Sequence, residues 1–271
     1  MKYRPEEDLI PFCRGPRFLL YGPRANGEEI NWSFKDFKPN ASRESWGELF
    51  QHIAQVAEEI GVKSLLAPTP TTFNGQITSV DNLIGNGSYR LDGLGSFTLY
   101  RGSPPVLAEG LILAPGDAIA ISSADCPTLT IWNEAENRVG VAHCGMLSLV
   151  RGVVANLIQA MKVDSGKLKA FIGAGAIQLP YTIGERTNEE LRNFIGGRKR
   201  IYHDHLIHLY DLIISLLEES GVKPNNIKSS QLCTINSQIS LARNNRSLCS
   251  QHLDHSTEMA GWRNLVIVHH P

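Results

Sequence analysis

The chain has 271 residues, and its 26 Lys and Arg nearly balance 27 Asp and Glu, for a formal net charge of −1. A chain without an overall basic field has no electrostatic basis for binding nucleic acid or an anionic membrane, so we expect neither partner. Its apolar runs stop short of the roughly 18 residues that a membrane helix needs, and its first residues are acidic where a signal peptide is basic, which together predict a soluble, cytoplasmic protein.

The N-terminal part predicts short strands and one helix. Residues 17–40 are interrupted by Gly and Pro around short apolar runs such as Phe18 to Tyr21, a pattern typical of strands and turns. From Leu49 to Ile60 the apolar residues recur at helical spacing until Gly61, which predicts a helix that ends there. Residues 65–116 again alternate short apolar runs with Gly and Pro, as strands and loops do.

The C-terminal part predicts an alternation of strands and helices. Strands are predicted at residues 118–122, 129–132, 139–143, 169–172, 230–235 and 265–269, and helices at 147–162, 188–194 and 205–218. The closing His269-His270-Pro271 is expected to be an edge strand or a disordered tail. No linker or internal repeat interrupts this alternation, so the sequence predicts one α/β or α+β domain over residues 1–271.

One segment of the sequence carries residues suited to chemistry. Cys126 follows a predicted strand directly, and His143 ends a neighbouring one, so their side chains can converge. Sulfur and imidazole nitrogen together favour zinc or copper over magnesium. Asp125, next to the thiol, is suited to orienting a ligand or moving a proton. The alternative is structural, with Cys126 as a small buried apolar residue and His143 as a hydrogen-bonded strand end.

The order of these motifs resembles that of the YfiH/laccase-domain family, once called multicopper polyphenol oxidases. The chain presents, in order, an Ala-Asp-Cys-Pro segment, a His-x-Gly segment, an Arg-Gly pair, an Ile-Gly-x-Gly segment, a Tyr-x-Ile-Gly-Glu segment and a Cys-Thr pair. These lie at 124–127, 143–145, 151–152, 172–177, 181–185 and 233–234. The resemblance is continuous over residues 108–271 and thin before them.

The resemblance implies a fold, a metal and a substrate class. It implies a single domain of mixed sheets flanked by helices that binds one zinc ion, rather than copper, through one Cys and two His. The implied substrates are adenosine-type purine nucleosides and phosphate, with phosphorolysis or deamination as the reaction. By position, Cys126 and His143 would be metal ligands and Asp125 a catalytic group. The resemblance says nothing about the oligomeric state.

The sequence departs from the family pattern at the third ligand. The family has a His in a Gln-Val-His-Gly segment, and the counterpart here is Thr-Phe-Asn-Gly, which puts Asn74 in its place. An amide oxygen is a poor zinc ligand beside imidazole, so a site of Cys126, His143 and Asn74 is expected to hold zinc weakly. A bend at Gly145 that turns Cys144 inward, or a distant His such as His205, His208, His252 or His255, would repair the site.

Three functions remain open on the sequence alone. The first is a purine nucleoside phosphorylase or adenosine deaminase with an altered metal site, in which Arg151 and Arg243 supply cationic partners for phosphate. The second is a family member that has lost catalysis and acts as a small-molecule binder or interaction partner. The third is metal-free chemistry by a Cys126 thiolate with His143 as its base.

Overall fold

The structure is a computed structural model that carries no metal, ligand or partner chain. It describes the central block of the chain continuously and other regions in shorter pieces. The described residues are 7–9, 15–22, 24–25, 28–29, 32, 47–62, 64–67, 75–79, 88–94, 97–102, 108–176, 181–182, 189–190, 193–194, 202–203, 206–230, 232–234 and 263–271.

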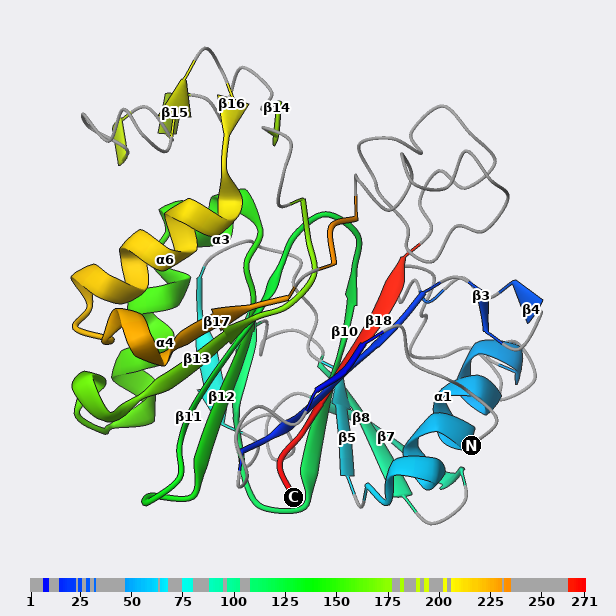
Figure 1. Ribbon diagram of the computed structural model, residues 1–271. Helices are drawn as coiled ribbons and strands as arrows, with labels where there is room; N and C mark the ends of the chain where they lie inside the picture. The colour runs from blue at the N-terminus through cyan, green and yellow to red at the C-terminus, as the bar shows by residue number, and fades with distance from the viewer. Residues whose placement is uncertain are drawn as a thin grey trace.

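Two mixed sheets form the centre of the protein (Figure 1). The first has seven strands in the order β1 (Glu7–Leu9), β2 (Arg17–Tyr21), β18 (Asn264–His269), β10 (Asp117–Ser123), β5 (Ser64–Ala67), β8 (Phe97–Gly102) and β7 (Ser88–Leu94). The second has six, in the order β17 (Ile227–Ser229), β13 (Lys169–Ile172), β11 (Thr128–Asn133), β12 (Arg138–His143), β9 (Gly110–Leu113) and β6 (Ile77–Ser79).

Helices cover the outer face of each sheet. Figure 1 shows α1 (Gly47–Ile60) on the side of the seven-stranded sheet, and α3 (Met146–Val150), α4 (Val153–Met161) and α6 (Leu209–Glu219) on the side of the six-stranded one. The remaining elements are small: β3 (Arg24–Ala25), β4 (Glu28–Glu29), β14 (Tyr181–Thr182), β15 (Tyr202–His203), β16 (Leu206–Ile207), and the 3₁₀ helices η1 (Ser165–Lys167) and η2 (Pro224–Asn226).

The central strands are buried on both faces, which explains their nearly continuous apolar sequence. In β18, Leu265 and Ile267 pack towards α1, whereas Val266 and Val268 lie in the core between the two sheets. In β11, Leu129 contributes to the core under α3, α4 and α6. Side chains that alternate along a strand therefore serve two different cores, and the protein has four layers.

The predicted fold class is confirmed, since both sheets contain parallel and antiparallel pairs and helices flank them. The helix predicted to end at Gly61 is α1, and Gly61 has a φ of 74° that suits a left-handed helix end. The strands predicted in the centre of the chain are β10 to β13. Among the described helices, none is long and apolar enough to cross a membrane.

Three predicted boundaries were wrong. The helix predicted at 147–162 is two helices, because Gly152 adopts a φ of 83° between them. The helix predicted from His205 begins at Leu209, with the short strand β16 before it. The strand predicted at 230–235 was placed too late in the chain, because β17 ends at Ser229. Within 230–235, Cys233 forms an isolated bridge with Gly175. Of the helix predicted at 188–194, residues 189–190 and 193–194 are described, and these residues are helical as predicted.

The chain end also differs from its prediction. Strand β18 runs to His269 and lies between β2 and β10 within the seven-stranded sheet, so it is neither an edge strand nor a tail. Burial, together with the nearby Arg17 and His270, lowers the pKa of His269. Its neighbour His270 is held through Nε2, 3.1 Å from the carbonyl oxygen of Asn137.

Candidate functional site

Residues far apart in the sequence meet at one end of the six-stranded sheet. Thr128 at the start of β11 lies opposite His143 at the end of β12. The backbone N–H of His143 donates to the carbonyl oxygen of Glu109 at 2.9 Å. The backbone N–H of Glu109 in turn donates to the carbonyl oxygen of Gln76 at 2.9 Å. On the other side, the N–H of Gly173 donates to the carbonyl oxygen of Thr128 at 2.8 Å. This end of the sheet therefore brings together five chain segments that are distant in sequence.

The thiol of Cys126 and the imidazole of His143 meet there. Cys126 lies in the turn between β10 and β11, which is closed by a hydrogen bond from the Ser123 hydroxyl to the Cys126 carbonyl oxygen. A β-carbon built on Gly145 would lie 3.0 Å from Cε1 of His143 and 3.6 Å from Sγ of Cys126. Both side chains therefore border the same point beside Gly145. The predicted convergence is confirmed, while the role of either residue as a metal ligand stays a prediction.

A third member, Glu109, was missed by sequence reasoning. Its Oε2 lies 3.2 Å from Nδ1 of His143, and its side chain is only 1% exposed. Glu109 precedes Leu111 by two residues, so it shares the face of β9 that points into the core between the sheets. An acidic residue at an inward position of an apolar strand is the signal that could have revealed it. We call Cys126, His143 and Glu109 the sheet-end cluster.

The other two residues of the cluster raise the pKa of His143. Burial alone would lower this pKa, but interactions with the side chains of Cys126 and Glu109 outweigh burial and raise it to about 10. His143 is 8% exposed, whereas Cys126 is partly exposed. Access from solvent to the cluster is therefore at the thiol, and the ring and carboxylate lie deeper.

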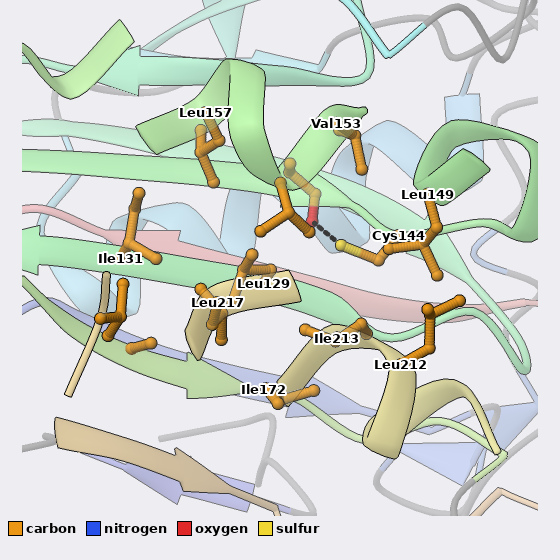
Figure 2. Packing of buried hydrophobic residues seen from close by; sticks show 14 of the residues in the cluster. Leu129, Ile131, Cys144, Leu149, Val153, Leu157, Ile172, Leu212, Ile213 and Leu217 are labelled. Atoms are coloured by element: carbon orange, nitrogen blue, oxygen red, sulfur yellow. Dashed lines mark hydrogen bonds between the residues drawn. The ribbon is translucent and has the colours of Figure 1, made fainter. Parts of the chain in front are cut away.

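Cys144 does not belong to the cluster. It points to the opposite face of β12 and is fully buried among the side chains of the helix-covered core, including Leu129, Leu149 and Val153 (Figure 2). Its Sγ lies 3.9 Å from the carbonyl oxygen of Ala142, and burial raises the pKa of its thiol. A bend at Gly145 does not turn Cys144 inward, so the repair of the site through this thiol is wrong.

Asp125, next to Cys126, is anchored by hydrogen bonds of its side chain and its backbone. It is 2% exposed, and its Oδ1 accepts a hydrogen bond of 2.9 Å from the hydroxyl of Thr234. Its carbonyl oxygen accepts one of 2.9 Å from the N–H of Ala176. The first bond ties the Ala-Asp-Cys-Pro segment to the Cys-Thr pair, and the second ties it to the Ile-Gly-x-Gly segment. A catalytic role for Asp125 stays a prediction.

The remaining predicted residues are described only in part. Asn74 and Arg243 lie outside the described residues. Gly75 is described, and its carbonyl oxygen accepts a hydrogen bond of 2.9 Å from the amide of Asn156. A β-carbon on Gly75 would lie 2.7 Å from the carbonyl oxygen of Arg151, so this segment lies against the junction of α3 and α4. The Arg151 guanidinium is 39% exposed and lies 3.6 Å from the carboxylate of Glu190.

Comparison with known proteins identifies the family. Residues 108–246, about half of the chain, match the model of the multi-copper polyphenol oxidoreductase laccase family. The chain belongs to this family. The match contains all three residues of the sheet-end cluster, together with Asp125, Arg151 and Arg243. No curated protein matches the chain by sequence.

Solved structures share the laccase-domain fold over nearly the whole chain. The hypothetical protein YfiH of Bacillus licheniformis is 18% identical with a TM-score of 0.66, covering 94% of this chain and 91% of that one. NMB0706 of Neisseria meningitidis and YlmD of Geobacillus stearothermophilus are each 16% identical with a TM-score of 0.69, covering 99% of this chain and 98% of theirs. At these identities the likeness shows the fold.

The zinc expected of a laccase-domain protein fits the cluster in part. Cys126 and His143 are zinc donors by chemistry, and a carboxylate holding the second nitrogen of a ligating His is a common feature of zinc sites. Within the described part of the chain, no group of three or more His, Cys, Asp or Glu is arranged to hold a metal ion. Of the distant histidines, His208 is described and precedes α6, whereas His205, His252 and His255 lie outside the described residues.

Proposed function

We propose that the protein processes adenosine-type purine nucleosides, by phosphorolysis or deamination, at the end of the six-stranded sheet, with a weakened zinc site. The observation that carries this proposal is the approach of the Cys126 and His143 side chains beside Gly145, which unites two of the three ligand positions expected for the family. Because Cys126 is partly exposed, a small molecule can reach the site at the thiol.

Each residue of the site has an assigned task in this proposal. Cys126 and His143 would hold zinc, with Asn74 as a weak third partner. When bound, zinc would supply a Lewis acid that stabilises developing negative charge. Asp125 would be the candidate proton carrier for deamination. Since its carboxylate already accepts from Thr234, this hydroxyl would fix the direction in which the second carboxylate oxygen faces.

Phosphorolysis adds a requirement for a cation. Phosphate must be held against the ribose while the purine base leaves, and a guanidinium offers the paired donors that suit a phosphate. Arg151 is partly exposed and its contact with Glu190 is long, at 3.6 Å, so phosphate would replace Glu190 at low cost. Arg243 would be the second cationic partner.

Turnover of adenosine and inosine tests the proposal directly. Each nucleoside is incubated with phosphate, with and without added zinc, and free base and inosine are separated by chromatography. We expect slow turnover that zinc increases. Cys126→Ala should lower it by about 100-fold or more, because the metal's charge stabilisation is lost. The matched control Cys13→Ala removes a thiol outside the family match and should leave turnover unchanged.

The alternative is a protein that has kept the fold and binds a small molecule without catalysis. The replacement of the ligand histidine by Asn74 and the pairing of Arg151 with Glu190 favour it. Saturable binding of adenosine or inosine, without any product in the presence of zinc, would select this alternative. Turnover that is the same in Cys126→Ala as in the unmodified protein would reject the site altogether.

A further inference from the structure

Glu109 is an acidic residue at a buried position, where a carboxylate is unfavourable for stability unless it is paired. It is 1% exposed, and its carboxylate oxygen Oε2 lies 3.2 Å from Nδ1 of His143. Its second oxygen, Oε1, is buried without a hydrogen-bond partner in the described part of the chain. An apolar side chain at this inward position, directly before β9, would avoid the cost of burying a carboxylate.

The contact with Glu109 determines which ring nitrogen of His143 remains available to a ligand. A carboxylate accepts hydrogen bonds, so it holds the ring with Nδ1 as the donor. The two nitrogens of an imidazole lie at different edges of the ring, so an Nδ1 that donates to Glu109 leaves Nε2 as the nitrogen available to a ligand. In this arrangement Glu109 acts on the ring through Nδ1, and the cluster offers a metal ion two donors, Nε2 of His143 and the thiol of Cys126.

We propose that Glu109 is the positioning residue of His143: its carboxylate accepts from Nδ1–H, fixes the ring, and directs Nε2 towards Cys126 and the bound ligand. The part of this inference that concerns zinc rests on the proposed function. The backbone supports the same arrangement, since the N–H of His143 donates to the carbonyl oxygen of Glu109 at 2.9 Å. Backbone and side chain of Glu109 thus hold both ends of His143.

Two substitutions separate positioning from charge. In Glu109→Leu, Nδ1 loses its acceptor, and we expect zinc affinity, measured by competition with a chromophoric chelator, to fall 10- to 100-fold. In Glu109→Gln the amide oxygen still accepts from Nδ1–H, so affinity should stay within about tenfold of the unmodified protein. The matched control is Glu134→Gln, which removes a carboxylate paired with Lys169 in the turn at the opposite end of β11 and should leave zinc affinity unchanged.

A second readout does not depend on metal. In ¹⁵N-labelled protein, the Nδ1 proton of His143 should appear downfield and exchange slowly, persist in Glu109→Gln, and move or vanish in Glu109→Leu. His143→Gln assigns the signal. Circular dichroism checks that each variant is folded.

The two readouts distinguish failure of the inference from failure of the proposed function. Folded Glu109→Leu with unchanged zinc affinity would overturn the positioning role and leave the zinc site standing. If the unmodified protein binds no zinc, the zinc part of the proposed function fails, and the Nδ1 proton decides the inference. A slowly exchanging Nδ1 proton in the unmodified protein that is lost in Glu109→Leu would support the positioning role of Glu109. Absence of this proton signal from the unmodified protein would overturn that role.

Discussion

Replacing Asn74 with His is expected to raise zinc affinity by about tenfold or more, since it exchanges a poor amide donor for the imidazole that zinc prefers. Asn74 itself is outside the described residues, but Gly75 follows it directly and Gln76 is bonded to Glu109 of the sheet-end cluster. The segment that carries residue 74 therefore leads to the same end of the six-stranded sheet as Cys126 and His143.

Zinc affinity of Asn74→His is measured by chelator competition beside two further variants. Asn225→His places an exposed imidazole in η2 and should leave the affinity unchanged. The double variant Asn74→His with Cys126→Ala should lose the gain, because the added ligand acts only together with the thiol. An affinity equal to that of the unmodified protein would show that residue 74 is not at the site.

Gly110→Ala is expected to destabilise the fold by about 3 kcal/mol or more. Gly110 begins β9 and lies opposite Ala142 of β12. A β-carbon there would overlap the Val141 carbonyl oxygen and lie 2.8 Å from both Cα and Cβ of Ala142. Backbone atoms in the middle of a sheet cannot move aside as the end of a flexible side chain can, so the strands would have to separate next to Glu109 and His143.

Urea unfolding followed by circular dichroism measures this effect as a lower midpoint. Gly166→Ala is the matched control, because a β-carbon there would lie 3.4 Å from the nearest atom, Oδ1 of Asp164, an ordinary contact. Its stability should change by no more than about 0.5 kcal/mol. A midpoint for Gly110→Ala close to that of the control would mean that β9 and β12 are not paired in the described register.

The central strands could be predicted from sequence because their apolar runs are long enough to be buried on both faces. Residues 118–122 and 129–132 are examples, and β10 and β11 extend each by only one or two residues. The approach of Cys126 and His143 could be predicted as well, because each follows or ends one of these strands. In both cases the information is local, within a few residues along the chain.

The remaining features depend on register and backbone conformation, which a single sequence does not fix. Glu109 reaches His143 only because β9 pairs with β12 so that Gly110 lies opposite Ala142, and no motif marks that pairing. The break between α3 and α4 at Gly152 interrupts an apolar pattern that is continuous in helical spacing. The sequence did not decide on which side of β12 the Cys144 side chain lies, because this depends on the path of the backbone at Gly145.

Cobalt substitution tests most directly the central claim that Cys126 and His143 act on one ligand from one end of the six-stranded sheet. Co²⁺ added to the metal-free protein should give a thiolate-to-cobalt charge-transfer band in the near ultraviolet, since cobalt accepts the same donors as zinc. The band should disappear in Cys126→Ala and weaken and shift in His143→Ala, while Cys13→Ala retains it. A band that persists unchanged in both Cys126→Ala and His143→Ala would place the metal elsewhere and contradict the account.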